Sequence, residues 1–206
     1  PLPAPVAAAR PPADAAAVAR ALARLSPALR PVILAGGGAV RAERPLRALA
    51  EALDAPVVQT VNARGLMHGH GLTVAASPSL PAFRALIAAA DAVLAVGTEL
   101  GPTDYDMYVR GGLPDLSGMI RVDVCAEQLA RHPAAVTVQG DAAEVLARLV
   151  RDVAPRRAEG AARAAAARAA ARAGLDPHMP PQLAMVEAIR DAMPDAIVVG
   201  DSTQPV

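Results

Sequence analysis

The sequence predicts an α/β protein built on a doubly wound parallel sheet. Short apolar segments recur along the 206 residues, and stretches with the helical spacing of apolar residues separate them. This alternation is typical of βαβ units, in which helices cover both faces of a parallel sheet. Right-handed crossovers between such units give a doubly wound layout. Apolar residues make up 53% of the chain, which is enough for a substantial core.

Five segments are predicted to form the strands of this sheet. They are rich in Val, Ile, Leu and Ala, as expected of strands that are buried on both faces. Glycine closes the first and the third of them, and proline stands at the entrance of the second, where a strand tolerates it. The five segments are 31–35, 55–60, 92–96, 118–124 and 135–139.

Four helices are predicted around the sheet. The first begins after Asp14, whose carboxylate can accept the free N–H groups of a first turn, and runs to about Leu25. Pro45 suits the first turn of the second helix, and Asp141 opens the last one. These later helices span about 43–53, 82–90 and 141–150.

The last quarter of the chain has a different composition. Residues 156–174 are almost all Ala, Arg and Glu, so we expect a helix; because Ala offers little surface to bury, we expect it to be a solvated connection. Gly174 suits its C-terminal cap, and three prolines within 177–181 prevent it from continuing. A further helix at 182–193 and a strand at 196–199 lead into a turn at 200–206.

We therefore expect four regions within an interior piece of a larger protein, because a strand and a turn with no following helix do not complete a domain. The regions are an extended linker at 1–12, a central α/β domain at 13–153, a helical and Pro-rich linker at 154–181, and the start of a second α/β domain at 182–206.

Charge and cysteine content exclude several classes of protein. Twenty basic residues, all of them Arg, balance twenty Asp and Glu, which removes the electrostatic case for a nucleic-acid or anionic-membrane binder. No apolar run approaches the roughly 20 residues of a membrane helix. Cys125 is the single cysteine and cannot form an internal disulfide, so a reducing cytoplasm is the expected location.

The glycine triplet at 36–38 follows the first predicted strand, and two interpretations of it stay open. The N–H groups of Gly37 and Gly38 could approach a nucleotide phosphate at the start of a helix. The triplet lacks the spacing of a dinucleotide fingerprint and the Lys of a P-loop, so it could equally be a tight structural turn. Asp123, at the end of the fourth strand, could accept hydrogen bonds from a ribose or cap a turn.

Two loops and one cysteine carry further candidate groups. His68 and His70 have no third ligand nearby, which favours a plain loop over the sheet edge rather than a zinc site. Three carboxylates within 98–106 suggest a metal or acid–base site, or a surface loop that meets a neighbouring domain or subunit. Cys125 has no histidine beside it in sequence, which disfavours a nucleophile.

Taken together, these segments resemble one family. In order they read RPVILAGGGA at 30–39, APVVQT at 55–60, ADAVLAVG at 90–97, IRVDV at 120–124 and GDA at 140–142. This series resembles the central, Rossmann-like domain of thiamine-diphosphate-dependent enzymes of the acetolactate synthase and 2-oxo acid decarboxylase type. The resemblance covers about residues 12–206.

The end of the chain, PDAIVVGDSTQ at 194–204, resembles the opening of that family's diphosphate-binding domain. The resemblance implies that Ser202, Thr203 and Gln204 match the turn that touches the diphosphate of thiamine diphosphate, where hydroxyl and amide donors suit phosphate oxygens. For the full-length parent it implies Mg²⁺, a 2-oxo acid substrate, and a homodimer or homotetramer. There the thiazolium ylid would add to the 2-oxo acid and CO₂ would leave. The resemblance leaves two outcomes open, namely simple decarboxylation and an acetolactate synthase-like carboligation.

The chain lacks two parts that the family's chemistry needs, namely the N-terminal domain's glutamate and the Gly-Asp-Gly…Asn motif for Mg²⁺. We therefore expect these 206 residues alone to be inactive and to bind no thiamine diphosphate. FAD is also disfavoured, because members that hold it usually carry Phe-Asp-Asp-Arg where this chain has GTELGPTDYD at 97–106, and many members have an acid in place of Cys125. The stretches 98–106 and 200–206 resemble the branch that includes 5-guanidino-2-oxopentanoate decarboxylase.

Two other functions stay open from the residues alone. One is a module that binds an adenine dinucleotide, FAD or NADP, of the electron-transfer flavoprotein or transhydrogenase type, with Gly37, Gly38 and Asp123 at the nucleotide. The other is an interaction scaffold without a ligand. Flanking sequence in the gene would separate them from the enzyme fragment.

Overall fold

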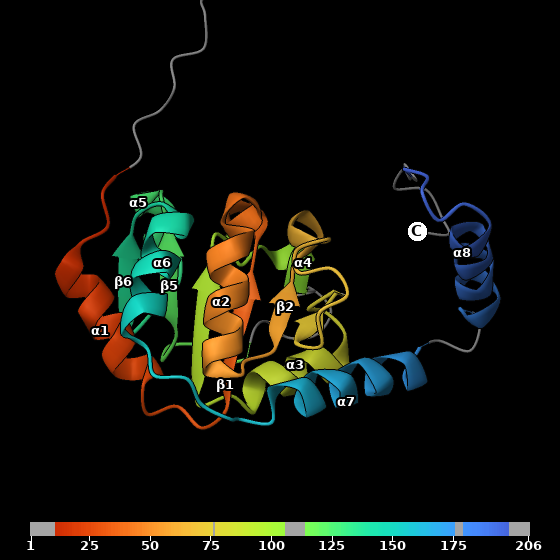
Figure 1. Ribbon diagram of the computed structural model, residues 1–206, viewed down its shortest axis with the longest axis horizontal. Helices are drawn as coiled ribbons and strands as arrows, with labels where there is room; N and C mark the ends of the chain where they lie inside the picture. Colours follow the sequence, from red (N-terminus) through yellow and green to blue (C-terminus); the bar gives the residue numbers. More distant parts are fainter. Residues whose placement is uncertain (1–10, 76, 106–113, 176–178, 198–206) are drawn as a thin grey trace, which may run out of the picture.

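Six strands form one sheet in the order β3-β2-β1-β4-β5-β6, and each neighbouring pair is parallel (Figure 1). This computed structural model describes residues 11–75, 77–105, 114–175 and 179–197. The prediction of a doubly wound parallel sheet is confirmed. The strands are β1 (Pro31–Ala35), β2 (Val57–Gln59), β3 (Thr73–Val74), β4 (Ala92–Val96), β5 (Ile120–Asp123) and β6 (Val136–Gln139).

Two of the predicted strands, β1 and β4, have the expected bounds, and three others are shorter than expected. Strand β3 was not predicted, because two residues are too few to show a periodic pattern; it forms by pairing with β2. The strand expected at 196–199 is not present at residues 196 and 197, and its last two residues lie outside the described part of the chain.

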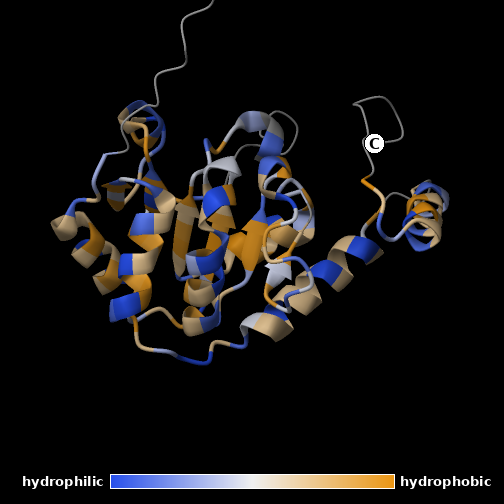
Figure 2. Cartoon of the chain, turned by 45° about the horizontal axis from the view of Figure 1, so that its top comes forward, coloured by the Kyte–Doolittle hydropathy of each residue, from blue (hydrophilic) through white to orange (hydrophobic). Residues whose placement is uncertain are grey.

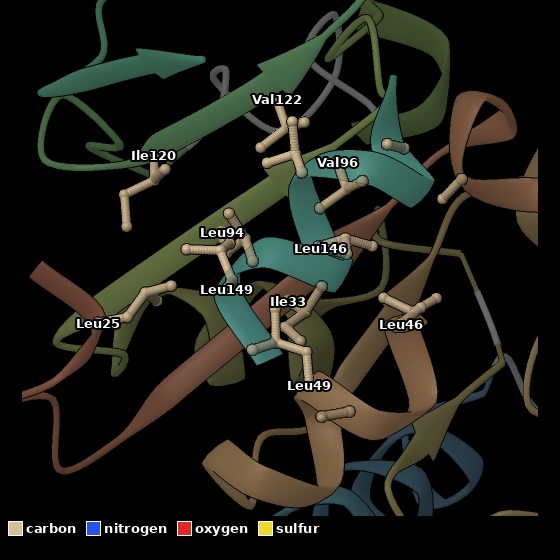
Figure 3. Close-up of a cluster of buried hydrophobic side chains, with 14 of the residues drawn as sticks. Leu25, Ile33, Leu46, Leu49, Leu94, Val96, Ile120, Val122, Leu146 and Leu149 are labelled. Carbon is tan, nitrogen blue, oxygen red and sulfur yellow. The ribbon is translucent and has the colours of Figure 1, made fainter. Parts of the chain in front are cut away.

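The strands alternate between two apolar clusters, which explains why they read as continuous apolar runs. Ile33, Leu94 and Val122 point into one cluster, which Figure 3 shows, and their sequence neighbours Val32 and Val93 point into the other. In Figure 2 the strands are accordingly the most evenly hydrophobic part of the molecule. The sheet is therefore the middle layer of three.

Helices α1 (Ala15–Leu25), α2 (Glu43–Leu53) and α6 (Ala142–Asp152) cover the first cluster. The predicted caps are confirmed: Asp14 accepts the N–H groups of Ala16 and Ala17, and Asp141 accepts those of Ala143 and Glu144. Helix α3 (Pro81–Ala88) and helix α7 (Gly160–Ala173) cover the second cluster. Shorter helical elements follow strands β1, β2, β4 and β5; in that order they are η1 (Gly37–Ala42), η2 (Val61–Ala63), α4 (Pro102–Tyr105) and α5 (Ala126–Ala130).

Helix α7 corrects the expectation of a solvated connection. It lies beside α3 (Figure 1) and also contacts β3. Its residues Ala164 and Ala167 belong to the second core cluster. The segment before it is also tied down, because Asp54 accepts the N–H group of Ala158 at 2.8 Å. One face of α7 is thus part of the central domain's core.

Helix α8 (Pro180–Ala192) follows α7, and none of its residues is buried. Its exposed apolar side chains include Met185, Val186 and Ile189. An ion pair of 2.9 Å between Arg172 of α7 and Glu187 of α8 joins the two helices. Among the described residues, no helix combines the length and the apolarity that crossing a bilayer requires.

Candidate functional site

The sheet's direction of winding reverses between β1 and β4, and in open α/β sheets this switch point is where ligands usually bind. The loops after these two strands meet there. Gly36 donates its N–H group to Val96 at 2.9 Å, and Gly38 donates to the carbonyl of Gly97 at 3.0 Å. The two loops are therefore joined directly by backbone hydrogen bonds.

Glycine is required at this junction by close backbone packing. A Cβ atom on Gly36 would lie 2.6 Å from the Cα atom of Thr98, and one on Gly97 would lie 2.5 Å from the Cα atom of Gly38. Gly97 also has a φ of 56°, which favours glycine. The structural interpretation of the glycine triplet thus has a physical basis in its contact with Gly97, which is distant in sequence.

The nucleotide-binding residues that the sequence suggested lie at the same carboxyl edge of the sheet. Gly37 and Gly38 are both exposed, but the N–H group of Gly38 is already engaged by the carbonyl of Gly97. Asp123 ends β5, and its Oδ1 accepts the N–H group of Cys125 at 2.9 Å, as expected of a carboxylate that caps a turn. A nucleotide at Gly37, Gly38 and Asp123 stays a prediction, and two of the three already have a structural role.

The loop after β2 is held by side chains that the sequence interpretation did not single out. Gln59 is fully buried and donates from Nε2 to the carbonyl of Leu66 at 2.5 Å. Glu43 accepts the N–H group of Met67 at 2.8 Å, and Thr73 donates to the Met67 carbonyl at 2.8 Å. Met67 itself is buried with a φ of 53°. This loop is consequently fixed over the edge of the sheet.

The two histidines of this loop have separate surroundings. His70 accepts the N–H group of Leu72 at Nδ1 and lies 3.1 Å from Glu51 through Nε2, while His68 is exposed. Within the described ranges, no three His, Cys, Asp or Glu side chains lie close enough together to hold a metal ion. Protein groups thus hold His70, whereas His68 is open to solvent.

The loop after β4 surrounds a buried arginine that sequence reasoning missed. Arg121, 1% exposed on β5, donates to the carbonyls of Gln128 at 2.7 Å and of Thr98 at 3.2 Å. An arginine within an apolar strand is the signal that could have found it, because a buried guanidinium needs several acceptors. Arg121 thereby joins the loop after β4 to helix α5.

Two titratable groups, Asp104 in the loop after β4 and His132 near Arg121, are perturbed by their surroundings. Burial raises the pKa of Asp104, and repulsion from Glu99 adds to this effect. Burial lowers the pKa of His132, as do the nearby charges of Arg121 and Arg131. Of the three carboxylates predicted in this loop, Asp106 lies outside the described residues. Both shifts favour the neutral form of the group.

Cys125 is half-buried and begins helix α5. Its Sγ donates to the carboxylate of Glu127 at 3.1 Å, so the thiol pairs with a carboxylate rather than with the histidine that usually activates a nucleophilic cysteine. The predicted thiamine-diphosphate contacts Ser202, Thr203 and Gln204 lie outside the described residues. Hydrogen bonds thus join the loops at the described edge of the sheet, but the residues expected to contact the cofactor are not part of those loops.

Comparison with known proteins decides the family. A family model described as "Thiamine pyrophosphate enzyme, central domain" matches residues 18–149, which is more than half of the chain. The chain belongs to this family. The match coincides with the six-stranded sheet and ends within α6, so the thiamine pyrophosphate enzyme assignment confirms the resemblance noted in the sequence.

Curated relatives point the same way. The chain is 38% identical over 198 residues to a probable 2-ketoarginine decarboxylase of Pseudomonas aeruginosa, covering 91% of this chain and 34% of that protein. It is 35% identical over 159 residues to a probable sulfoacetaldehyde acetyltransferase of Rhizobium meliloti, covering 74% of this chain and 27% of the relative. The chain thus spans between about a quarter and a third of the length of these relatives.

Solved structures share the fold. A putative thiamin diphosphate-dependent enzyme from Mycobacterium smegmatis matches with a TM-score of 0.59 and 23% identity over 73% of this chain and 30% of its own. Benzoylformate decarboxylase from Polynucleobacter necessarius matches with a TM-score of 0.62 and 20% identity over 75% and 30%. None of these reported matches supports the flavoprotein or transhydrogenase alternative.

Proposed function

We propose that the protein containing this chain is a thiamine-diphosphate- and Mg²⁺-dependent enzyme that decarboxylates a 2-oxo acid. In it, residues 13–153 would form the central domain and residues 182–206 would begin the diphosphate-binding domain. The observation that carries the proposal is the 38% identity to a probable 2-ketoarginine decarboxylase, because that alignment covers 91% of the chain and so extends beyond the central domain.

The substrate proposed first is 2-ketoarginine, which is 5-guanidino-2-oxopentanoate. The resemblance of the 98–106 and 200–206 stretches to that branch supports the same choice. An acetyltransferase acting on sulfoacetaldehyde is the second candidate, supported by 35% identity over 74% of the chain. That alignment covers less of the chain, so decarboxylation is the better-supported reaction.

The described residues would contribute a scaffold to this enzyme. Bound thiamine diphosphate would supply the electron sink for the pair of electrons that CO₂ leaves behind. The loops after β1 and β4, joined at Gly38 and Gly97, would hold the carboxyl edge of the central domain rigid. Ser202, Thr203 and Gln204 stay the proposed diphosphate contacts, and a cytoplasmic homodimer or homotetramer stays the expected assembly.

The test is an assay of the complete reading frame that contains these residues. With thiamine diphosphate and Mg²⁺ present, we expect CO₂ release from 5-guanidino-2-oxopentanoate and little turnover of sulfoacetaldehyde. Omitting thiamine diphosphate should abolish the release. Turnover of sulfoacetaldehyde with no decarboxylation would instead establish the second candidate.

The isolated 206-residue chain provides the matching control. We expect it to release no CO₂ and to show no binding of thiamine diphosphate by calorimetry, because the chain lacks the motif that holds Mg²⁺ on the diphosphate. Binding in the micromolar range to this chain would contradict the assignment of residues 1–206 as one edge of a larger site.

A further inference from the structure

A groove of about 600 Å³ lies at the β3 edge of the sheet, away from the loops at the switch point. Its volume is in the range of small-molecule sites, which is about 300–1,000 Å³. It is formed by the loop before β3, the start of α3, the last turns of α7 and one residue of α8. The residues that line it are Gly69, His70, Gly71, Thr73, Ala75, Leu80, Phe83, Arg168, Ala171, Arg172, Leu175 and Leu183.

The groove has an apolar floor and a cationic side. Phe83 is 1% exposed and, together with Leu80 and Ala171, belongs to the core or packs against it. Arg168 and Arg172 lie four residues apart, so they occupy the same face of α7. The described residues that line the groove include no Asp or Glu. The lining therefore combines an apolar surface with positive charge.

The two arginines keep donors available. Arg168 uses only Nη1 among the described residues, donating to the carbonyls of Thr73 at 2.6 Å and Gly71 at 3.3 Å. These bonds fix the guanidinium at the edge of the sheet and leave Nε and Nη2 to donate elsewhere. Arg172 already holds one carboxylate, that of Glu187, at 2.9 Å. A ligand carboxylate would therefore share Arg172 with Glu187 or displace Glu187, whereas Arg168 offers it unused donors.

We propose that this groove binds a small molecule with one carboxylate and an aliphatic body. The carboxylate would lie between Arg168 and Arg172, and the aliphatic part would lie against the half-buried Leu80, Leu175 and Leu183. Charge-assisted hydrogen bonds from two arginines favour a negatively charged group on the ligand, and the apolar floor favours an aliphatic remainder. This site is independent of the proposed decarboxylase function.

The probe is octanoate, titrated calorimetrically into the 206-residue chain. We expect saturable binding with one site per chain, and weaker binding of 1-octanol, which lacks the charge. Arg172→Gln should weaken octanoate binding about tenfold, the usual size of one lost charge-assisted hydrogen bond. Ala171→Phe should abolish binding by filling the groove. Absence of saturable heat with octanoate would overturn the proposal.

Two further variants separate the groove from helix α8. Arg190 lies with Val186 and Ile189 at a different, smaller hollow of about 240 Å³ on α8, so Arg190→Gln should leave octanoate binding unchanged. Glu187→Gln breaks the ion pair with Arg172 but frees that arginine, so it should leave binding unchanged or strengthen it. If Glu187→Gln weakens binding as much as Arg172→Gln does, Arg172 acts through its ion pair with α8 and does not hold the ligand. If Arg190→Gln weakens binding to that extent, octanoate binds at the hollow on α8. Either result would overturn the proposal.

Discussion

Helices α7 and α8 are neighbours in sequence, but their burial is the reverse of what their side chains suggest. Helix α7 consists of Ala, Arg and one Gly, yet Gly160, Ala164 and Ala167 are buried. Helix α8 carries Leu, Ile, Val and Met, and none of its residues is buried. Burial in this chain therefore depends on what each helix packs against rather than on the apolar content of the helix.

The close approach of Gly160 to the backbone of Asp54, and hydrogen bonds from arginine side chains to backbone carbonyls, explain the position of α7. A Cβ atom on Gly160 would lie 2.6 Å from the carbonyl carbon of Asp54, so only glycine lets the helix begin there. Arg163 donates to the carbonyl of Pro31 at 3.1 Å, and Arg168 donates to that of Thr73. Small residues bring the helix close, and arginines from it satisfy carbonyls around the sheet, which large apolar residues could not do.

Hydrogen exchange provides the most direct test of this contrast. If α7 belongs to the cooperative unit of the central domain and α8 does not, amides of α7 should exchange on the order of 10³ times more slowly than those of α8. The measurement is native-state exchange of the 206-residue chain followed by mass spectrometry of peptides from each helix. Equal protection of the two helices would mean that α8 is docked as firmly as α7.

Among substitutions within α7 and α8, that of Gly160 should have the largest effect on stability. In an ordinary helix Gly→Ala stabilises by about 1 kcal/mol, but here the added methyl group collides with the backbone of Asp54, so Gly160→Ala should cost about 2–3 kcal/mol. Urea unfolding measures the change. Gly174→Ala at the other end of α7 is the matched control, because the nearest atoms to its Cβ would be the carbonyl oxygens of Ala170 at 3.3 Å and Ala171 at 3.8 Å. A stabilised Gly160→Ala variant would rule out the close contact.

Enlarging a buried alanine tests the same packing with a smaller expected effect. Ala164 is fully buried in the second core cluster, so Ala164→Leu should overpack the interface with α3 and cost about 1–2 kcal/mol. Ala165, next to it on α7, is exposed, and Ala165→Leu should change the unfolding free energy by less than about 0.5 kcal/mol. Indistinguishable unfolding curves for the two variants would show that α7 is not packed on the core.

The same contrast explains which parts of the structure the sequence could reveal. Strands β1 and β4 have the predicted bounds because a strand buried on both faces is a continuous apolar run. Caps such as Asp14 are equally visible, because they act within four residues. Strand β3 and the burial of α7 were not predictable, since both depend on contacts between segments distant in the chain.

The candidate site likewise has some features that the sequence reveals and others that depend on contacts between distant segments. The glycine triplet at 36–38 is conspicuous in the sequence, but the reason for it lies in Gly97, which only the pairing of β1 with β4 brings into contact. Gln59 and Arg121 are polar residues within apolar strands, and that incongruity is a signal that a closer sequence analysis could use. Their acceptors, in the loops after β2 and β4 and in α5, could not be named without the fold.

Truncating an apolar side chain on α8 should have the smallest effect of all. Ile189 is 37% exposed and belongs to neither core cluster, so Ile189→Ala should lower the unfolding free energy of this chain by less than about 0.5 kcal/mol. The higher helix propensity of Ala offsets part of any lost contact. The reference is Leu86→Ala on α3, which removes a core side chain and should cost about 2–4 kcal/mol in the same urea titration. Should the two variants lose equal stability, Ile189 would have a packing partner in solution, and the distinction between a bound α7 and an unpartnered α8 would not hold.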